Sequence, residues 1–387
     1  MLLKKPKKNY WEERSRMSNI PKLRFPEFKG EWEEKKIIQF CEISAGGDID
    51  KNNSQKEYSS SYPYSVYSNS LENKGLYGYA NYYKIDSDVV TVTGRGDVGH
   101  AVARHEKFVP IVRLLVCKPK NNENVNFLEN AINKTKIFIE STGVPQLTAP
   151  QLGNVKLFLP SLAEQQKIAD FLSNVDSIIT AETKILNTLQ KKKKALMQKL
   201  FTRQLRFKSD DGKDFPAWEE KKVIDFAKVD TGANNTQDKV EDGPYPFYVR
   251  SPIIYRSNKY IFDFPEAVLT VGDGVGTGKV FHYVQGKFDC HQRVYVIHDF
   301  ENVLGKYFYF YFSEKFYARV KPMSAKNSVD SVRREMITDM KIPIPCKAEQ
   351  QKIADCLSSL DSLIQNQQKV VTTWQQRKKA LLQQMFV

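Results

Sequence analysis

Two stretches of the chain carry apolar residues at the spacing of a long amphipathic helix. In residues 159–202 these residues follow the a and d positions of a heptad: Ile168, Phe171, Val175, Ile178, Ile185 and Leu189. Pro160 precedes Ser161, and Glu164 follows three residues later, which is the form of a capping box. About 40 residues at about 1.5 Å each predict a helix of roughly 60 Å. A helix this long cannot bury its apolar stripe against itself, so we expect it to pack on the matching stripe in residues 344–387.

Residues 20–158 and 203–343 show strand alternation and turn residues more than helical spacing. Strands are predicted at residues 89–93, 111–117 and 293–297. One helix is expected in each region, and in the second its apolar positions are Val303, Leu304, Tyr307, Phe308, Tyr311 and Phe312. Because this aromatic run has the helical period, we interpret it as core packing. Both regions are therefore predicted to be globular α+β domains, preceded by a basic tail at residues 1–19.

The chain repeats itself once. The sequence WEEKKIIQF at residues 32–40 returns as WEEKKVIDF at residues 218–226, and AEQQKIAD at residues 163–170 returns at residues 348–355. Residues 159–201 and 344–386 align without a gap and are identical at about half of their positions. Between these anchors the halves diverge, although residues 62–68 align with 245–251 and residues 89–99 with 267–278. Two copies in one chain indicate a pseudo-two-fold internal repeat, which predicts that the two long helices pair in antiparallel fashion.

The composition favours a polyanionic partner. The chain of 387 residues has 59 Lys and Arg against 45 Asp and Glu, which is a formal net charge of +14. No apolar run of membrane-spanning length occurs and the five cysteines form no CxxC pair, so we expect a cytoplasmic protein without a membrane segment. The five histidines form no metal-binding motif, so no metal site is predicted.

Two glycine-rich sequences resemble nucleotide-binding motifs but lack essential parts. Gly94–Gly99 matches GxGxxG after a predicted strand, yet residues 100–104 continue in alternation where a dinucleotide-binding fold needs a helix. Gly274–Lys279 resembles a phosphate-binding loop, but it is one residue short and Val280 replaces the Ser or Thr that binds Mg²⁺. We therefore predict neither a catalytic constellation nor a cofactor. Two alternatives stay open: a stand-alone dinucleotide- or S-adenosylmethionine-binding enzyme that uses the Gly94–Gly99 loop, and a coiled-coil nucleic-acid adaptor.

Contacts with nucleic acid are expected from basic, amide and tyrosine side chains on the predicted loops. Such side chains donate hydrogen bonds to phosphate oxygens or read base edges. Because the two globular domains diverge, they predict an asymmetric target with two different half-sites. The candidates are Tyr67, Arg95, His100, Arg104 and Gln146 in the first half, and Arg250, Arg256, Lys279, Gln292, Arg293, Lys326, Arg333 and Arg334 in the second.

The order of domains and the repeated helix sequences resemble the DNA-specificity subunit of type I restriction-modification systems. The resemblance is carried by LPSLAEQQKIADFL at residues 159–172, by IPIPCKAEQQKIADCL at residues 342–357, and by the duplicated opening around WEEKK. It implies a non-catalytic protein with two target-recognition domains, residues 20–158 and 203–343, each reading one half of a bipartite double-stranded DNA site.

The same resemblance implies roles for the helices and for partner proteins. The helices at residues 159–202 and 344–387 are expected to separate the two domains, to set the spacer between the half-sites and to dock two methylating subunits. S-adenosylmethionine is expected in those methylating subunits and not in this chain, and restriction subunits are expected to complete the complex. The family offers no catalytic residues to carry over to this chain.

Overall fold

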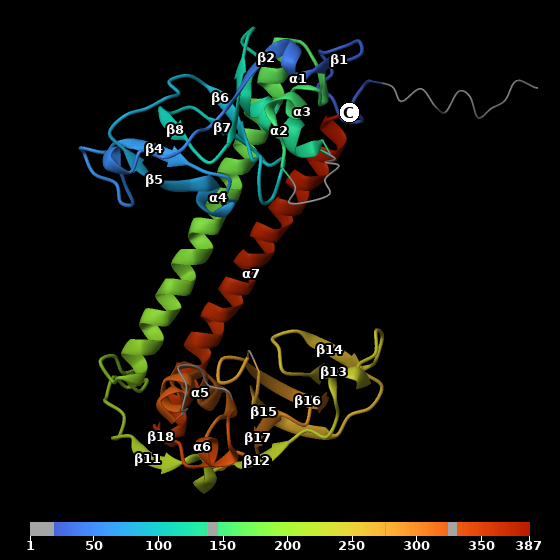
Figure 1. The fold of residues 1–387 in the computed structure, drawn as a ribbon. Helices are drawn as coiled ribbons and strands as arrows, with labels where there is room; N and C mark the ends of the chain where they lie inside the picture. Colours follow the sequence, from blue (N-terminus) through green and yellow to red (C-terminus); the bar gives the residue numbers. More distant parts are fainter. Residues whose placement is uncertain (1–18, 136, 138–145, 275, 324–330) are drawn as a thin grey trace, which may run out of the picture. The chain divides into compact units, whose positions relative to one another are not determined.

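The computed structural model describes residues 19–135, 137, 146–274, 276–323 and 331–387 of the chain (Figure 1). The chain divides into two compact units: unit 1 comprises Met1–Thr183 with Val370–Val387, and unit 2 comprises Lys184–Lys369. Each unit therefore combines one of the predicted globular domains with a part of each long helix. Of the predicted tail at residues 1–19, residues 1–18 lie outside the described residues, and so does the candidate Lys326.

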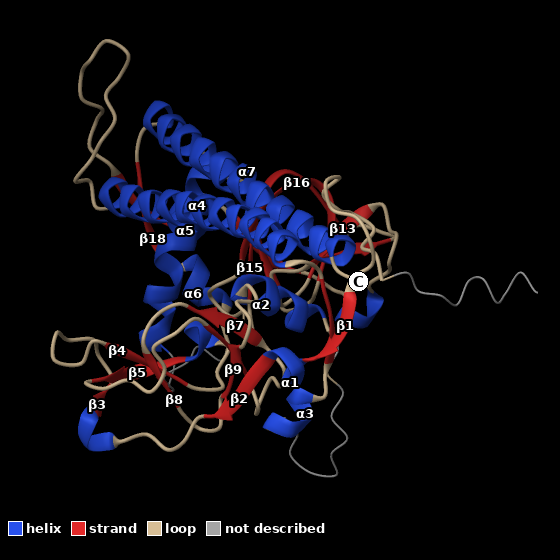
Figure 2. Ribbon diagram, turned by 90° about the horizontal axis from the view of Figure 1, so that it is seen from above, coloured by secondary structure: helices blue, strands red, loops and turns tan. Residues whose placement is uncertain are grey.

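Among the described residues, unit 1 contains two four-stranded sheets and one two-stranded sheet (Figure 2). The first sheet is antiparallel, in the order β2 (Cys41–Ala45), β9 (Leu115–Pro119), β6 (Val89–Val92) and β7 (Ala101–Arg104). The second has the order β3 (Ser54–Gln55), β5 (Leu76–Ala80), β4 (Tyr64–Tyr67) and β8 (Phe108–Pro110), with β4 and β8 parallel. The third pairs β1 (Glu33–Lys36) with β10 (Lys156–Leu159). The helices are α1 (Ile37–Phe40), α2 (Val125–Lys134) and α3 (Ala149–Gly153), with 3₁₀ turns at Lys51–Asn53 and Glu72–Gly75.

The main core of unit 1 lies between α2 and the first sheet. The helix begins after Asn124, whose side-chain oxygen accepts the backbone N–H of Phe127. Phe127 is fully buried, and the rings of Trp32 and Phe386 lie 5.8 and 5.2 Å from it between centroids. Phe386 directly follows helix α7 (Lys347–Met385), so the end of α7 is part of this core.

Unit 2 contains one large sheet and one two-stranded sheet among the described residues. The large sheet has the order β12 (Lys228–Thr231), β17 (Val294–His298), β15 (Phe262–Val271), β16 (Phe281–Cys290), β13 (Tyr245–Tyr248) and β14 (Ile254–Ser257). Only β13 and β16 pair in parallel. The small sheet pairs β11 (Glu219–Lys222) with β18 (Lys341–Ile344). The helices are α5 (Gly305–Val320) and α6 (Arg334–Thr338), with 3₁₀ turns at Val223–Asp225, Thr236–Asp238 and Lys321–Met323.

The aromatic run of α5 packs in the core of unit 2, as its helical period predicts. Tyr307, Phe308, Phe310 and Phe312 are fully buried. The ring of Phe281 in β16 meets Phe312 edge-on, with centroids 5.5 Å apart. The helix itself begins at Gly305, because Leu304 has an extended backbone, so the predicted positions 303 and 304 lie before its first turn.

The two predicted long helices are confirmed as α4 (Leu162–Phe201) and α7 (Lys347–Met385). In unit 1, Asp176 of α4 forms an ion pair with Lys378 of α7 at 2.6 Å, and in unit 2, Lys193 of α4 forms an ion pair with Asp361 of α7. From the first pair to the second, the residue number rises along α4 and falls along α7, which is an antiparallel register. The sequence repeat relates the two aspartates to each other and the two lysines to each other. No helix that the structure describes is long and apolar enough to cross a membrane.

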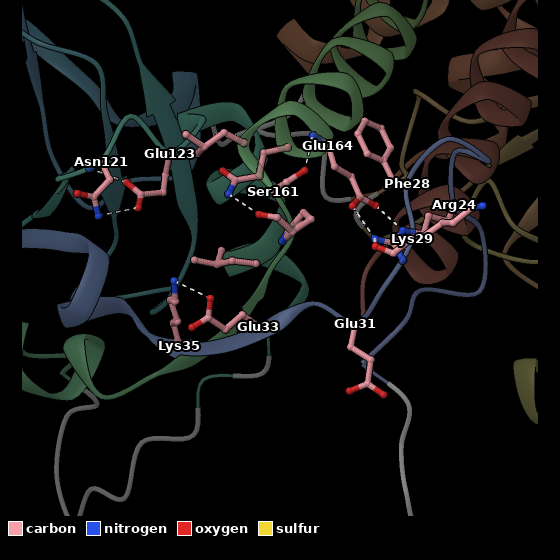
Figure 3. A pocket seen from close by; sticks show the side chains of 14 residues that line it. Arg24, Phe28, Lys29, Glu31, Glu33, Lys35, Asn121, Glu123, Ser161 and Glu164 are labelled. Carbon is pink, nitrogen blue, oxygen red and sulfur yellow. Dashed lines mark hydrogen bonds and ion pairs between the residues drawn. The ribbon is translucent and has the colours of Figure 1, made fainter.

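A buried glutamate near the start of each long helix holds the opening segment of its unit. In unit 1, Arg24 donates two hydrogen bonds to the carboxylate of Glu164, at 2.7 and 2.8 Å (Figure 3). The indole N–H of Trp32 donates a third to the same carboxylate at 3.3 Å. Glu164 is only 1% exposed. Its carboxylate therefore does not complete the predicted capping box, although the Ser161 hydroxyl accepts the Glu164 N–H at 3.4 Å.

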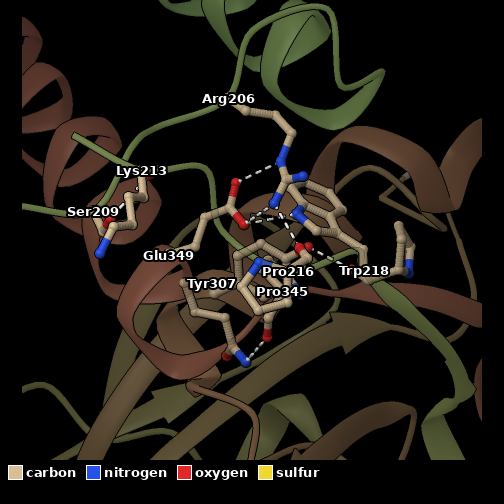
Figure 4. Close-up of polar contacts among 10 residues, drawn as sticks. Arg206, Ser209, Lys213, Pro216, Trp218, Tyr307, Pro345 and Glu349 are labelled. Atoms are coloured by element: carbon tan, nitrogen blue, oxygen red, sulfur yellow. Dashed lines mark hydrogen bonds and ion pairs between the residues drawn. The ribbon is translucent and has the colours of Figure 1, made fainter. Parts of the chain in front are cut away.

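Unit 2 repeats this arrangement with Arg206, Trp218 and Glu349 (Figure 4). Arg206 donates to the two oxygens of Glu349 at 3.0 and 2.6 Å, the indole of Trp218 donates at 2.9 Å, and Glu349 is 0% exposed. We call each set of three residues a glutamate clamp. A buried carboxylate needs such partners, because desolvation of an unpaired charge is costly. The clamp gives a physical reason why the tryptophan of WEEKK and the glutamate of AEQQ occur in both copies.

The hydrogen-bond registers show that β4 of unit 1 corresponds to β13 of unit 2. In the parallel pairs, Tyr67 of β4 lies opposite Pro110, and Tyr248 of β13 lies opposite Cys290. The burial pattern along β4 is also the same as that along β13. The alignment of residues 62–68 with 245–251 is therefore wrong by two residues. A shift of two keeps each side chain on the same face of a strand, so alternation alone cannot detect it.

The predicted strand at residues 111–117 is shorter in the structure. Strand β9 begins only at Leu115, because Val112 and Arg113 have φ values of 53° and 59° and form a turn. A left-handed backbone cannot continue a strand. The other two predicted strands correspond to β6 and β17.

Candidate nucleic-acid interface

Loops of unit 1 are tied together where its strands end. The Gly94 N–H donates to the side-chain oxygen of Asn69 at 2.7 Å, and the Gly94 carbonyl accepts the N–H of Leu147 at 2.9 Å. The side-chain amide of Asn69 also donates to the carbonyl of Val112 at 2.6 Å. These contacts define loop cluster 1. It brings together two predicted DNA contacts, because the guanidinium of Arg95 lies 3.5 Å from Oε1 of Gln146.

The Gly94–Gly99 sequence forms a tight turn and not a dinucleotide-binding loop. Gly96 and Gly99 have φ values of 70° and 87°, which glycine adopts without strain. The Thr93 hydroxyl accepts the N–H of His100 at 2.9 Å, and the chain continues as strand β7. A dinucleotide site needs a helix there, whose N-terminus binds the pyrophosphate. The turn leaves Arg95 exposed.

The corresponding loops of unit 2 are tied together by similar backbone contacts. The Val332 N–H donates to the Gly272 carbonyl, and the Gly272 N–H donates to the Arg293 carbonyl, both at 2.7 Å. Asp273 forms ion pairs with two predicted contacts, Arg250 at 3.3 Å and Arg293 at 3.7 Å. These contacts define loop cluster 2.

Three more predicted contacts belong to loop cluster 2. The side-chain amide of Gln292 donates to the side-chain oxygen of Asn235 at 2.7 Å. Arg333 and Arg334 follow Val332 at the start of α6, and both are exposed. The structure thus gathers five of the sequence candidates at one end of the large sheet: Arg250, Gln292, Arg293, Arg333 and Arg334.

A four-residue turn at the same place in both clusters identifies a residue that sequence reasoning missed. The turns Ile111–Leu114 and His291–Val294 are each closed by the N–H of the last residue on the carbonyl of the first, at 3.1 and 2.8 Å. The first residue of each turn donates its N–H to the last residue of β4 or β13. Arg113 thus corresponds to Arg293, and both are exposed. Neither Val112 nor Arg113 is a turn-forming residue, so nothing in the sequence marks this turn.

The two clusters share a backbone frame, in which only the turn of unit 1 is left-handed, but they differ in the side chains that the frame carries. Where one unit has an amide or a cation, the equivalent position of the other unit has a different chemical group. The equivalent pairs are Asn69 and Arg250, Arg95 and Asp273, and Gln146 and Ser331. Different hydrogen-bonding groups on one frame suit the reading of different base sequences.

Two candidates of unit 1 are buried and have partners inside the protein. Arg104 is 4% exposed, and its guanidinium lies 3.6 Å from the ring centroid of Tyr67. Arg104 donates to the Thr91 hydroxyl at 3.2 Å and to the Lys74 carbonyl, and the Tyr67 hydroxyl donates to Glu106 at 2.6 Å. Burial raises the pKa of Tyr67 and lowers the pKa of Arg104. The structure gives this pair a role inside unit 1 in joining its two sheets.

The remaining candidates lie outside the two clusters of contacts. Arg256 in β14 donates to the carbonyls of Gly243 and Pro244 at 2.7 and 2.9 Å, so its guanidinium holds a loop. Lys279 is exposed, with its ammonium 4.9 Å from the ring centroid of Tyr317. Burial, and then the charge of Arg104, lower the pKa of His100. His100 is therefore neutral at neutral pH and offers a hydrogen bond rather than a charge.

The turn that carries Arg293 is expected to weaken in acid. Its first residue, His291, is 4% exposed and accepts the N–H of Arg293 on Nδ1 at 2.9 Å, which requires the neutral ring. Burial, and then the Arg250 guanidinium, lower the pKa of His291 below 6.5. The unfolded state therefore binds a proton first as the pH falls, and the stability that the neutral ring contributes above pH 6.5 is lost below it.

Hydrogen exchange of the Arg293 amide measures this loss. We expect its protection, corrected for intrinsic exchange, to fall between pH 7 and pH 5. The equivalent amide of Arg113 is a matched control, because Ile111 stands where His291 stands in unit 2. Equal pH dependence of the two amides would show that His291 is not the cause.

A polar pocket of about 490 Å³ lies beside the clamp of unit 1 (Figure 3). Cations and anions alternate along its wall, among them Arg24, Lys35, Glu33 and Glu123, and Lys35 pairs with Glu33 at 2.8 Å. Mixed charge of this kind selects no single ligand. In the part of the chain that the structure describes, no group of three or more His, Cys, Asp or Glu side chains could hold a metal ion.

Comparison with known proteins places the chain in a family. The family model of the type I restriction modification DNA specificity domain matches twice, at residues 29–191 and 217–373. The chain therefore belongs to the family of type I restriction-modification DNA specificity proteins, as its repeated sequences indicate. The first match contains loop cluster 1 and the second contains loop cluster 2, so each unit carries one specificity domain.

The relatives include specificity subunits from distant organisms. A putative type I specificity subunit of Mycoplasma pneumoniae is 33% identical over 141 residues, which cover 35% of this chain and 39% of the relative. The specificity subunit of the type I restriction enzyme MjaVIII from Methanocaldococcus jannaschii is 26% identical over 271 residues, 63% of this chain and 64% of the relative. The matches thus span less than two thirds of these relatives' length.

A solved structure shares the fold at low sequence identity. The S subunit of a type I restriction-modification system from M. genitalium superposes with a TM-score of 0.69 at 14% identity, covering 95% of this chain and 99% of that one. At this identity the match concerns the fold alone.

Proposed function

We propose that this chain is the DNA-reading subunit of a type I restriction-modification complex, with each unit reading one half of a bipartite, asymmetric double-stranded DNA site. The observation that carries the proposal is the pair of loop clusters, which share one backbone frame and present different side chains. A shared frame supports a shared task, and the different side chains support different half-sites.

In this proposal the chain itself is not catalytic. Two methylating subunits, docked on the helix pair, bind S-adenosylmethionine and transfer the methyl group, and restriction subunits join them in the cytoplasm. Support comes from the family, from the net charge of +14 and from a glycine-rich turn that runs into a strand. The experiment that tests the proposal is methylome sequencing of cells that express this chain with its methylating subunits. A methylated motif of two different half-sites around a fixed spacer supports it, whereas no motif, or one continuous motif, contradicts it.

The helix pair is expected to set the spacer. Four residues inserted in α4 near Thr188, with a matching insertion in α7, add about one helical turn of 5.4 Å, against about 3.4 Å for each base pair. We therefore expect the preferred spacer to grow by about one or two base pairs while both half-sites stay the same. The methylome gives both quantities in one measurement. Changed half-site bases at an unchanged spacer would refute the role of the helices as a ruler.

A further inference from the structure

A group of two tyrosines and a lysine lies at the start of strand β4 in unit 1, and one tyrosine and the lysine are exposed. The rings of Tyr64 and Tyr83 meet edge-on, with centroids 5.0 Å apart and an angle of 63° between their planes. The ammonium of Lys107, the residue before β8, lies 4.5 Å from the centroid of the Tyr83 ring. Tyr83 is 40% exposed and Lys107 is exposed as well.

The same group occurs at the equivalent place in unit 2. Tyr245 is the first residue of β13, as Tyr64 is of β4, and its ring lies 4.9 Å from that of Tyr260 at an angle of 62°. The ammonium of Lys287 lies 4.6 Å from the centroid of the Tyr260 ring. Lys287 precedes Phe288 as Lys107 precedes Phe108, and both phenylalanines are fully buried in the adjoining strand. We call these two groups the tyrosine–lysine triads.

The triads are a surface feature that occurs in the same form in both units. In the loop clusters, three of the equivalent positions carry different groups, whereas here all three side chains agree in type and in geometry. A feature common to two readers of different half-sites cannot specify bases. It serves something that both half-sites have in common, and every half-site has the same phosphodiester backbone.

The chemistry of the triads suits a phosphate. Tyrosine hydroxyls and lysine ammonium groups donate hydrogen bonds to phosphate oxygens. Neither Lys107 nor Lys287 forms an ion pair with a carboxylate among the residues that the structure describes, although Asp263 lies opposite Lys287 in the register of β15 and β16. Contact with a ring face orients each ammonium, and contact with the Tyr260 side chain also raises the pKa of Lys287, which favours its charged form.

We propose that each tyrosine–lysine triad binds the phosphate backbone of DNA and positions its unit on the duplex without regard to sequence. This inference rests on the proposed function, since it assigns a second contact to the same two readers. The triad and the arginine of the turn lie on one stretch of chain in each unit, Lys107 with Arg113 and Lys287 with Arg293. Six residues of extended chain reach at most about 20 Å, and the major groove is about 12 Å wide, so one duplex can meet both.

The test is a salt titration of DNA binding by the full chain in complex with its methylating subunits. The variant K107Q/K287Q removes both ammonium groups, and K22Q/K347Q removes two exposed charges outside the triads as a matched control. Each variant is titrated with a duplex that carries the target and with one whose half-sites are scrambled. We expect K107Q/K287Q to weaken both duplexes by the same factor and to reduce the slope of log K against log salt by about 2, about 1 for each lysine.

A second variant separates binding from folding. Y83F/Y260F keeps the ring contacts and removes only two hydroxyls, so it should weaken both duplexes equally with an unchanged unfolding midpoint. The proposal is overturned if K107Q/K287Q keeps its affinity and salt slope while the unfolding midpoint falls, which would make the triads structural. It is also overturned if DNA affinity stays and assembly with the methylating subunit is lost. If the parent complex does not discriminate the target from the scrambled duplex, the proposed function fails instead, and that result is read from the same titrations.

Discussion

Replacement of Glu349 by alanine is expected to lower the free energy of unfolding by about 3 kcal/mol, because it leaves the half-buried Arg206 and Trp218 without the buried carboxylate that they share. Glu349 is 0% exposed and accepts three hydrogen bonds, two from Arg206 and one from Trp218. Loss of one partner of a buried ion pair costs about 3–5 kcal/mol. We expect the lower end of that range, since the Arg206 side chain is 29% exposed and water can solvate it in part.

Urea unfolding, followed by far-ultraviolet circular dichroism, measures this loss. Two variants serve as controls. E349Q keeps an oxygen for one donor, so it should lose less stability than the alanine variant. E219A removes a carboxylate that is 72% exposed and pairs with Lys221, so its effect should stay within about 0.5 kcal/mol. If E349A were no less stable than E219A, the glutamate clamp would not hold unit 2 together.

Exchange of residues 20–158 for the same region of a relative is expected to replace one half-site completely and to leave the other half-site and the spacer as they were. All the side chains of loop cluster 1 lie within these residues, among them Asn69, Arg95, Arg113 and Gln146. Loop cluster 2 and both long helices lie outside them. Methylome sequencing of cells that carry the chimera with its methylating subunits measures the outcome.

The clamp sets a condition on this chimera. Arg24 and Trp32 lie inside the exchanged region, while their acceptor Glu164 lies outside it. The region taken from the relative must therefore contain an arginine and a tryptophan at the equivalent positions. A region that lacks them would change the stability of unit 1, and the chimera would then not report DNA recognition. The reciprocal exchange of residues 203–343 should change only the second half-site. A change of both half-sites in either chimera would contradict the assignment of one reader to each unit.

The repeated helices and the aromatic core could be predicted because their signals are periodic and local. The heptad spacing in residues 159–201 and the helical period of the aromatic residues near Tyr307 each report a buried face directly. It could also be predicted that no dinucleotide-binding helix follows the glycine-rich sequence at Gly94, since the alternation after it is incompatible with a helix. The family followed from the duplicated sequences, which two matches of its domain model confirm.

The errors concern contacts that link residues far apart in the sequence. The capping-box spacing predicts a local cap at Glu164, yet Arg24 and Trp32 donate to its carboxylate, and no pattern around Glu164 indicates them. Arg104 is predicted on a loop, but it lies in strand β7 and is buried over the ring of Tyr67. Arg113 was hidden because a valine and an arginine adopt left-handed backbone without a glycine to mark the turn. The hydrogen bonds of the two turns establish that Arg113 is equivalent to Arg293.

The left-handed turn at Val112 and Arg113 has a consequence for the energetics of association. Left-handed backbone in non-glycine residues costs on the order of 1–3 kcal/mol each and persists only where the surrounding structure imposes it. Here a hydrogen bond from Asn69 to the Val112 carbonyl and the closing bond of the turn impose it. The conformational entropy of this turn is therefore lost when unit 1 folds and not when it meets DNA. Arg113 is preorganised, and association at this point should carry little ordering penalty.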